Sequence, residues 1–112
     1  MAHVTATFSN GHTDTYKGNR EVTAAWMVVE VATGRVIDSG HSLTVQAAEK
    51  TAKASVPRAV MLPTGWRDHK NTPAGHRCAK SAGYRSPREM EQDYKRQNAE
   101  KAKQYRTEVV AL

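Results

Sequence analysis

Large apolar residues are concentrated between Val22 and Ala32, the only stretch dense enough in them to seed a core. Side chains alternate between the two faces of a strand, so this stretch splits into a wholly apolar set and a second set (Ala25, Met27, Val29 and Val31; Ala24, Trp26, Val28 and Glu30). The four valines are β-branched, which favours a strand over a helix. We expect the wholly apolar face to pack on a helix and the Trp26 face to be covered by a later segment.

Two Thr-rich runs precede this strand and have the alternation that is typical of strands, at residues 3–8 and 12–17. Between them lies Asn10-Gly11, the strongest short hairpin signal, because a tight turn there requires a positive φ at both residues. A two-residue turn sets Phe8 opposite Thr13. The resulting ribbon is mostly polar, and a two-stranded ribbon needs another surface to lie on.

A second hairpin is predicted after the apolar strand. Thr33-Gly34 allows a tight turn into a strand over residues 35–41, which sets Val31 opposite Val36. Together the two hairpins provide three to four antiparallel strands.

The helical repeat begins after this second hairpin. Apolar residues recur at spacings of three, four and four, which is one buried stripe on a helix from Ser42 to Ala54 and just beyond it (Val45, Ala48, Ala52 and Val56). Either Ser42 or Thr44 can cap the helix by accepting from a free backbone N–H, and Pro57 ends it. The small alanines allow this helix to approach the sheet closely.

Residues 57–86 are interrupted repeatedly by proline and glycine, so we expect this segment to be irregular. Its one apolar run, Ala59-Val-Met-Leu62, is interpreted as a last strand or as a plug against the Trp26 face. Ser86-Pro87-Arg88-Glu89 then has the capping-box pattern of a helix start, and a thin apolar stripe extends that helix to about Val109.

The sequence therefore predicts an α+β fold: a small antiparallel sheet of three to four strands, from two hairpins, packed on one helix. The chain is expected to consist of a sheet-and-helix platform over residues 1–56, a basic irregular arm over 57–86 and a C-terminal helix over 87–110.

The net charge of +6 lies in one segment, because residues 57–88 carry seven basic residues and one acidic residue while the parts before and after are each neutral. The residues expected to contact a partner are these seven cations and two aromatic anchors: Arg58, Trp66, Arg67, Lys70, Arg77, Lys80, Tyr84, Arg85 and Arg88. Cations neutralise phosphates and aromatic rings stack on unpaired bases, which favours nucleic acid. The same cations fit an acidic groove on a protein, and a basic run also occurs as a plain solvated linker.

Three residues of the basic segment have metal-ligand chemistry, namely His69, His76 and Cys78. Apart from Asp68 no fourth ligand lies near them, and their spacing matches no common structural zinc pattern, so we expect no metal site.

Catalytic arrangements are equally sparse. Cys78 and His76 lack an orienting third group. Glu30 and Asp38 approach each other across the predicted hairpin, but charged residues on an exposed sheet face usually keep it soluble. The glycines form no phosphate-binding loop. We therefore expect no cofactor and no enzymatic activity.

No apolar run reaches about 18 residues, so no membrane span is predicted. Residues 1–15 lack the basic start and apolar core of a signal peptide. A single cysteine, Cys78, rules out an internal disulfide and fits a reducing compartment. We expect a cytoplasmic protein without membrane contact.

Two resemblances add context. Residues Trp26–Val56, with Ala47-Ala48-Glu49-Lys50-Thr51-Ala52, resemble the second half of a double-stranded-RNA-binding domain. The phosphate-binding lysine cluster of that family is absent at Ser42-Leu43-Thr44-Val45-Gln46, so RNA binding is not carried over.

Residues 1–56, with their Thr-rich hairpin, Arg20 before an apolar strand, a Gly turn and an Ala-rich helix, also resemble small uncharacterised bacteriophage early or accessory proteins. This resemblance implies a phage product that acts in the host cytoplasm on host machinery such as RNA polymerase, a nuclease or a defence system.

The resulting hypothesis is a small basic non-enzymatic binding protein that acts on nucleic acid or on host nucleic-acid machinery, as a host-takeover or anti-defence inhibitor. The alternative is a direct DNA- or RNA-binding accessory protein without a protein target. The oligomeric state is left open.

Overall fold

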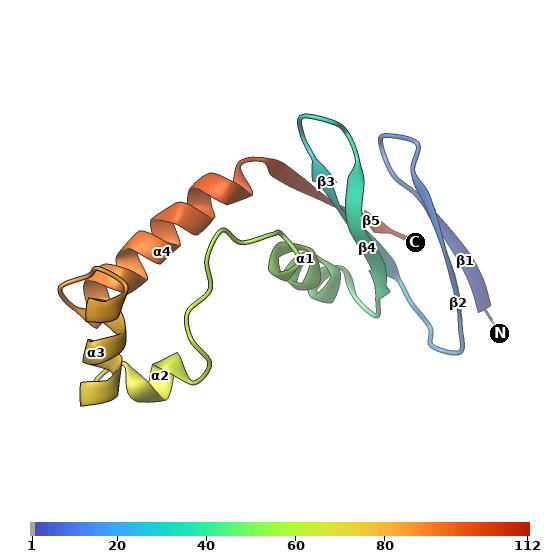
Figure 1. Cartoon of the computed structure of the whole chain (residues 1–112). Helices are drawn as coiled ribbons and strands as arrows, with labels where there is room; N and C mark the ends of the chain where they lie inside the picture. Colours follow the sequence, from blue (N-terminus) through green and yellow to red (C-terminus); the bar gives the residue numbers. More distant parts are fainter. Residues whose placement is uncertain (1) are drawn as a thin grey trace. The chain divides into compact units, whose positions relative to one another are not determined.

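The computed structural model describes residues 2–112 and divides them into two compact units (Figure 1). The sheet unit comprises the residues up to Pro57 together with Lys103–Leu112, and the helical unit comprises Arg58–Ala102. The predicted α+β class is confirmed. The predicted arm and C-terminal helix lie largely within one unit, and the end of the chain belongs to the first unit. Among residues 2–112, no helix has both the length and the apolar character needed to cross a membrane.

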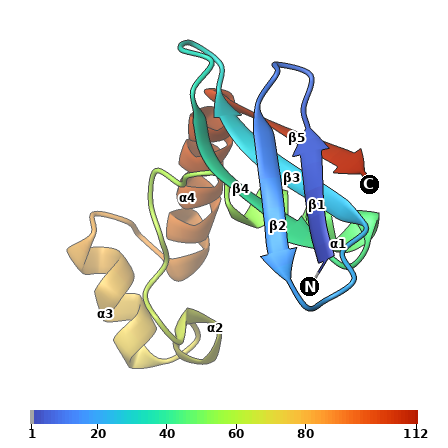
Figure 2. The same cartoon turned by 90° about the vertical axis from the view of Figure 1, so that its right-hand side faces the viewer.

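The sheet unit has three layers (Figures 1 and 2). Its central layer is a three-stranded antiparallel sheet of order β4-β3-β5, with β3 at Ala24–Glu30, β4 at Val36–Ser42 and β5 at Tyr105–Ala111. Helix α1 (Val45–Ala54) covers one face of this sheet. The antiparallel hairpin of β1 (Ala2–Thr7) and β2 (Thr13–Gly18) covers the other.

Strand β3 is buried on both faces. The helix packs on the Trp26 face and not, as predicted, on the wholly apolar face. The Trp26 face packs on α1, and the wholly apolar face packs on the first hairpin through Phe8 (Trp26 with Ala24, Val28, Ala48 and Ala52; Phe8 with Ala6, Ala25, Met27 and Val29). Small side chains on α1 explain why the helix packs on the Trp26 face. Ala48 and Ala52 are the only fully buried side chains of α1, and they leave room for the indole of Trp26. Val31 lies outside the strand and is 57% exposed.

Helix α1 agrees with its predicted stripe. Ala48 and Ala52 are fully buried, and Val45 and Val56 pack against the same cluster. Of the two predicted caps the structure has Thr44, whose Oγ1 accepts from the N–H of Ala47 at 3.1 Å.

The first hairpin differs from the prediction by one residue in register. Thr7 lies opposite Thr13, and the N–H of Phe8 donates to His12 across a three-residue connection. A two-residue turn needs a positive φ at Asn10, whereas only Gly11 adopts one, at +85°. Asn10 instead accepts the N–H of His12 with its side chain, at 2.9 Å. The prediction of a tight Asn-Gly turn is therefore wrong.

The second connection is also longer than predicted. Val36 lies opposite Val29 rather than Val31, and the register shifts between Val28 and Val29. Thr33 explains the wider loop, because its hydroxyl donates to Glu30 at 2.7 Å and accepts the N–H of Arg35 at 3.2 Å. Glu30 is therefore engaged within the loop.

Strand β5 was not predicted, because the C-terminal helix was expected to continue to about residue 109. The helix ends at Ala102, and Tyr105–Ala111 pairs along the whole of β3. Tyr105 and Val109 are four residues apart, which places them on one face of a helix and equally on one face of a strand. Ser9 joins the first hairpin to this strand through hydrogen bonds from its N–H and hydroxyl to Glu108, which lower the pKa of that carboxyl.

The helical unit contains α2 (Trp66–His69), α3 (Pro73–Ser81) and α4 (Pro87–Ala102). The expectation of an irregular segment over 57–86 is thus wrong for the two shorter helices. Pro73 occupies the first turn of α3 behind the cap Thr72, a position where proline starts a helix rather than breaking one. The core of this unit is Trp66, Ala79 and Met90, with Cys78, Tyr84 and Tyr94 packed around it. Residues 59–62 form no strand.

Candidate interface of the helical unit

The helical unit carries most of the excess charge of the chain. Arg58–Ala102 contains ten Arg and Lys against five Asp and Glu, a net charge of +5 out of +6. The sheet unit is close to neutral. The predicted basic segment therefore coincides with a folded unit rather than with a linker.

Five of the predicted contact residues are exposed cations: Arg58, Arg67, Arg77, Lys80 and Arg88. None of the five makes an ion pair within residues 2–112. Arg77 and Lys80 share the outer face of α3, because the inner face is formed by the buried residues Gly75 and Ala79. These five side chains, which we name the cationic set, remain free to meet an acidic partner.

The other two predicted cations are engaged within the unit. Lys70 lies 3.5 Å from Glu91, and Arg85 lies 3.2 Å from Glu89 one turn along the chain. Arg85 is nevertheless 92% exposed, so its pair is a weak surface contact that a stronger anion can replace.

Trp66 does not have the exposed position expected of an anchor. Its ring is 6% exposed in the core beside Ala79 and Met90, and its Nε1 donates to Glu91 at 2.6 Å. The hydrogen bond satisfies the one polar atom of the indole, so the ring can be buried without loss. Trp66 packs in this core against α4, so its ring is not exposed as the predicted role of a partner anchor requires.

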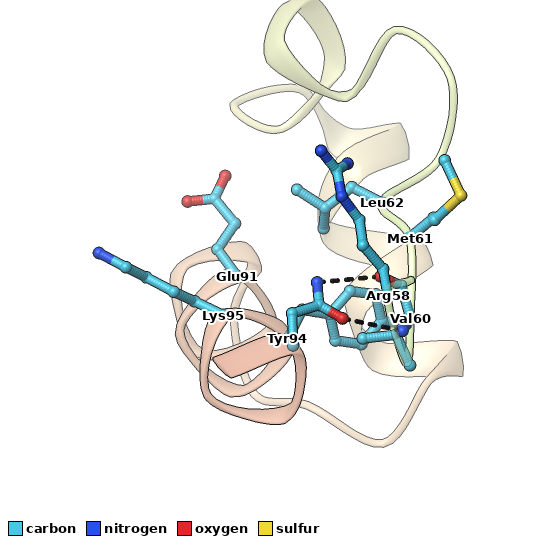
Figure 3. A pocket seen from close by; sticks show the side chains of 8 residues that line it. Arg58, Val60, Met61, Leu62, Glu91, Tyr94 and Lys95 are labelled. Atoms are coloured by element: carbon cyan, nitrogen blue, oxygen red, sulfur yellow. Dashed lines mark hydrogen bonds between the residues drawn. The ribbon is translucent and has the colours of Figure 1, made fainter. Parts of the chain in front are cut away.

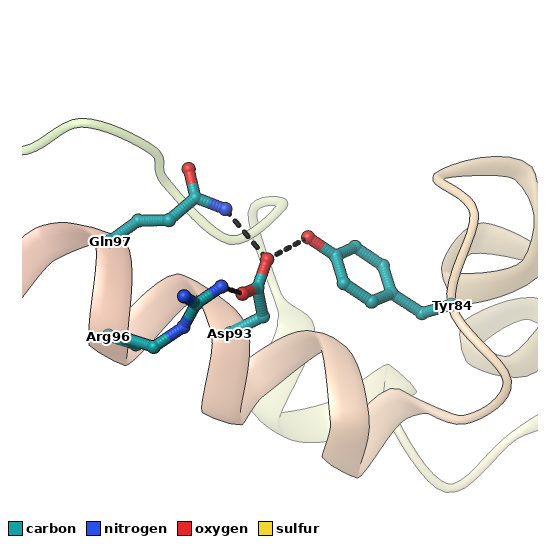
Figure 4. A network of polar contacts seen from close by, with 4 residues as sticks. All are labelled: Tyr84, Asp93, Arg96 and Gln97. Atoms are coloured by element: carbon teal, nitrogen blue, oxygen red, sulfur yellow. Dashed lines mark hydrogen bonds and ion pairs between the residues drawn. The ribbon is translucent and has the colours of Figure 1, made fainter.

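Tyr84 is likewise engaged (Figure 4). Its hydroxyl donates to Asp93 at 2.5 Å, and its ring packs edge-on against Tyr94. Arg96 and Gln97 also donate to Asp93 from one turn further along α4. The hydrogen bond from Tyr84, followed by those from Arg96 and Gln97, lowers the pKa of Asp93 to about 2. The bond to Asp93 raises the pKa of Tyr84.

This network fixes the connection between α3 and α4 rather than presenting an aromatic surface. The spacing of Asp93 and Arg96, three residues apart on one helix, indicates only a helix-stabilising ion pair. The contribution of Tyr84 depends on how the chain turns between the two helices, which no local spacing reveals.

An extended apolar segment lies along α4 and was not predicted as part of the site (Figure 3). The N–H of Val60 donates to Oδ1 of Asn98, and Nδ2 of Asn98 donates back to the carbonyl of Val60, both at 3.0 Å. This pair of bonds mimics strand pairing and fixes the backbone at Val60. Next to it Met61 is 74% exposed and Leu62 is 39% exposed.

A cavity of about 370 Å³ adjoins this segment. It is bounded by the apolar segment and by α4, with cations at its border (Arg58, Val60, Met61, Leu62, Glu91, Tyr94, Lys95 and Asn98). The side chains of Arg58 and Lys95 are exposed. The apolar run at residues 59–62 was the signal in the sequence, but it was interpreted as a strand or a plug.

The histidines and the cysteine of the basic segment are not gathered around one point. Cys78 and His69 line a second cavity of about 240 Å³ beside Trp66, while His76 is exposed on α3. Within residues 2–112, no three side chains of the metal-binding types converge on a common point.

Comparison with known proteins adds no relative: no family model matches the chain, and neither a curated protein nor a solved structure matches it. The arrangement itself therefore carries the functional argument. It combines free cations, a rigid extended segment and two exposed apolar side chains on one small unit, which is chemistry suited to binding.

Proposed function

We propose that the helical unit is a protein-binding module, and that the chain is a small non-enzymatic protein that docks on an acidic surface of a partner. The observation that carries the proposal is the exposed pair Met61 and Leu62, which is held by Asn98 and flanked by Arg58. Single exposed apolar residues are ordinary. Here two neighbours are exposed on a fixed backbone beside cations.

Such an arrangement has the parts of a binding hot spot. Affinity is concentrated in a few well-packed anchors, and a segment already held in its bound conformation loses little entropy on binding. Met61 supplies a flexible apolar anchor that adapts to a partner groove. The cationic set supplies steering towards negative charge, which chiefly raises the association rate.

The positions of the aromatic rings favour a protein partner over single-stranded nucleic acid. Stacking on unpaired bases requires exposed aromatic faces. In the helical unit Trp66 is buried, and Tyr84 and Tyr94 are half-buried and packed on each other. A phosphate backbone offers no apolar surface against which the exposed methionine beside the apolar cavity could be buried.

Within this proposal the partner is a host protein of the nucleic-acid machinery, such as RNA polymerase or a nuclease, and the binding takes place in the host cytoplasm. The resemblance of residues 1–56 to small bacteriophage proteins supports this context. A bacterial lysate is therefore the first source in which to look for the partner.

The second candidate function is direct binding to the phosphate backbone of double-stranded nucleic acid. The five unpaired exposed cations favour it, because each contact with a phosphate releases counterions. In that case Met61 and Leu62 are incidental to binding.

Capture of partners by the immobilised full chain from a nuclease-treated bacterial lysate tests the proposal. We expect a protein that is retained by the native chain, lost with Met61→Asp and retained with Val31→Asp. Val31 is a matched control, since it is 57% exposed and apolar but lies in the sheet unit. A protein that Met61→Asp still retains contradicts the proposed site.

Fluorescence anisotropy with duplex and single-stranded oligonucleotides distinguishes the second candidate. Direct phosphate binding predicts an affinity that falls steeply between about 50 and 200 mM salt and that Met61→Asp leaves nearly unchanged. Weak oligonucleotide binding that does not depend steeply on salt, together with a protein that is still captured after nuclease treatment, supports the protein-binding module proposed here.

A further inference from the structure

Strand β5 lies at one edge of the three-stranded sheet, and among residues 2–112 no strand pairs with its outer side. An edge strand presents backbone N–H and C=O groups that can pair with another chain, and proteins commonly protect such edges with proline, lysine or a bulge. Tyr105–Ala111 contains none of these, and its register with β3 is continuous. The opposite edge, β4, includes Gly40 and has a register shift where it pairs with Val28 and Val29. Strand β5 is therefore the regular edge of this sheet.

The hydrogen bonds of the β3–β5 ladder show which groups of β5 point outward. At one end the N–H of Val31 donates to the carbonyl of Gln104, and at the other the N–H of Leu112 donates to the carbonyl of Thr23, both at 2.9 Å. Directly opposite residues of antiparallel strands alternate between hydrogen-bonded and non-hydrogen-bonded pairs. The even-numbered residues of β5 therefore bond to β3, and the odd-numbered residues direct their N–H and C=O groups away from it.

The charges of β5 are self-complementary about Thr107. Arg106 and Glu108 flank it and share the face towards the first hairpin, where Glu108 accepts from Ser9 and lies 3.8 Å from Arg106. In an antiparallel pair of β5 strands with Thr107 opposite its counterpart, each Arg106 lies opposite the Glu108 of the other strand. The Arg106 side chain is 43% exposed, and a guanidinium has five donors, so it can serve both carboxylates.

The same charges disfavour the neighbouring registers. Only odd-numbered residues of β5 have outward N–H and C=O groups, so the nearest alternatives are centred on Arg106 or on Glu108. Each alternative sets two like charges directly opposite each other, which destabilises a sheet. The charge pattern therefore selects the register centred on Thr107.

The apolar side chains of β5 fit this register as well. Tyr105 and Val109 lie on the face of the sheet that α1 covers, and both are half-buried. In the register centred on Thr107, Tyr105 of each strand lies opposite Val109 of the other. Pairs of an aromatic and a β-branched residue stabilise antiparallel strands.

We propose that two copies of this chain pair through β5, antiparallel and centred on Thr107. A twofold axis perpendicular to the sheet relates the copies, as in an isologous dimer. The two three-stranded sheets then form one sheet of order β4-β3-β5-β5-β3-β4, with both α1 helices on one face. This interface lies in the sheet unit and does not depend on the proposed docking segment.

Sedimentation equilibrium of the full chain, combined with residue-resolved hydrogen exchange over a range of chain concentrations, tests the interface. We expect a monomer–dimer equilibrium in which the amides of Thr107 and Val109 become protected as the dimer fraction rises. The amides of Glu108 and Val110 bond to β3 and are expected to be protected at every concentration. A chain that stays monomeric at all soluble concentrations overturns the proposal, even if it pairs with a foreign peptide strand. A dimer in which Thr107 and Val109 stay unprotected also overturns it.

Charge variants test the register. Arg106→Glu is expected to raise the dissociation constant of the dimer about tenfold, because symmetry turns two attractive pairs into two repulsive ones. Glu108→Lys has the same effect, whereas an equimolar mixture of the two variants pairs again, since each supplies the charge that the other lacks. Arg35→Glu makes the same change at an exposed position of the sheet unit outside β5 and leaves the dimer intact. Equal weakening by Arg106→Glu and Arg35→Glu, or a mixture that does not recover, refutes this register.

A backbone variant tests the strand pairing itself without altering a charge. The N–H of Thr107 points away from β3, so Thr107→Pro removes a donor of the proposed ladder and none of the existing one. We expect Thr107→Pro to be monomeric with the circular dichroism of the native chain, while Thr107→Val, which keeps the N–H, dimerises. A folded Thr107→Pro chain that dimerises like the native chain overturns the proposal.

Discussion

The two hydrogen bonds between Asn98 and Val60 give the most direct test of how the extended segment at residues 59–62 is held against α4. Both are 3.0 Å long, and both disappear in Asn98→Ala. The substitution leaves α4 itself intact, because alanine is the better helix former by about half a kcal/mol. The loss is therefore local to the extended segment.

The magnitude follows from these two bonds. Each net hydrogen bond contributes about 0.5–1.5 kcal/mol, so the pair contributes about 1–3 kcal/mol to keeping the segment closed. Val60 is only half-buried, so water recovers part of this loss and the lower half of the range applies, about 1–2 kcal/mol. We expect the amide of Val60 to exchange with solvent about 5–30-fold faster in the variant.

Native-state hydrogen exchange followed by nuclear magnetic resonance measures this rate residue by residue. Gln92→Ala is the control, since Gln92 is exposed on the same helix and makes no hydrogen bond to the segment. Exchange of the Val60 amide at the native rate in Asn98→Ala, with the amides of α4 still protected, contradicts a role for these two bonds in holding the segment. In that case side-chain packing alone holds the segment.

Three further outcomes are expected. Gly75→Ala places a Cβ 2.3 Å from the carbonyl of His69. Overpacking of this kind costs about 1–3 kcal/mol against a gain of about 1 kcal/mol in helix propensity, so urea unfolding of the helical unit shifts to lower concentration, whereas Ser81→Ala on the same helix does not shift it downward. The depressed pKa of Asp93, about 2 against an ordinary 3.8, means that its contribution is present above pH 4 and is lost as the pH falls towards 2. Acid titration of stability in the native chain and in Asp93→Asn shows this as a difference that vanishes at low pH, and parallel curves at all pH values contradict it. Met27→Ala removes a side chain that is 0% exposed and lowers the unfolding free energy of the sheet unit by about 2–5 kcal/mol, measured by circular dichroism in denaturant, while Val31→Ala stays within about 0.5 kcal/mol.

The elements with strong local signals were predictable. The apolar run at 22–32, the Ala-rich stripe of α1 and the capping box before α4 each specify one element whatever surrounds them. The faces of β3 were not predictable, because both are apolar and the choice depends on which partner has the small side chains. The end of α4 was missed since Tyr105 and Val109 satisfy both periodicities.

The positive charge of the candidate site was predictable from the sequence, but its exposed apolar residues were not. Seven cations could be counted in the sequence, and the structure leaves five of them unpaired. The role of Trp66 depended on a contact with Glu91, which is 25 residues away and beyond any local pattern. Met61 looked like core material because apolar runs usually are, and its exposure follows from the side-chain pairing of Asn98 with the backbone.

The position of β5 makes the helical unit an insertion within another folding unit. Ala24 pairs with Ala111, so the central strand β3 can pair with β5 only after residues 105–111 have been synthesised and have left the ribosome. Arg58–Ala102 is synthesised before that moment, and its own core of Trp66, Ala79 and Met90 is already complete. Closing a loop of this length has an entropic cost, which is smaller when the intervening chain is compact. The order of synthesis therefore favours folding of the helical unit before the sheet of the sheet unit is completed.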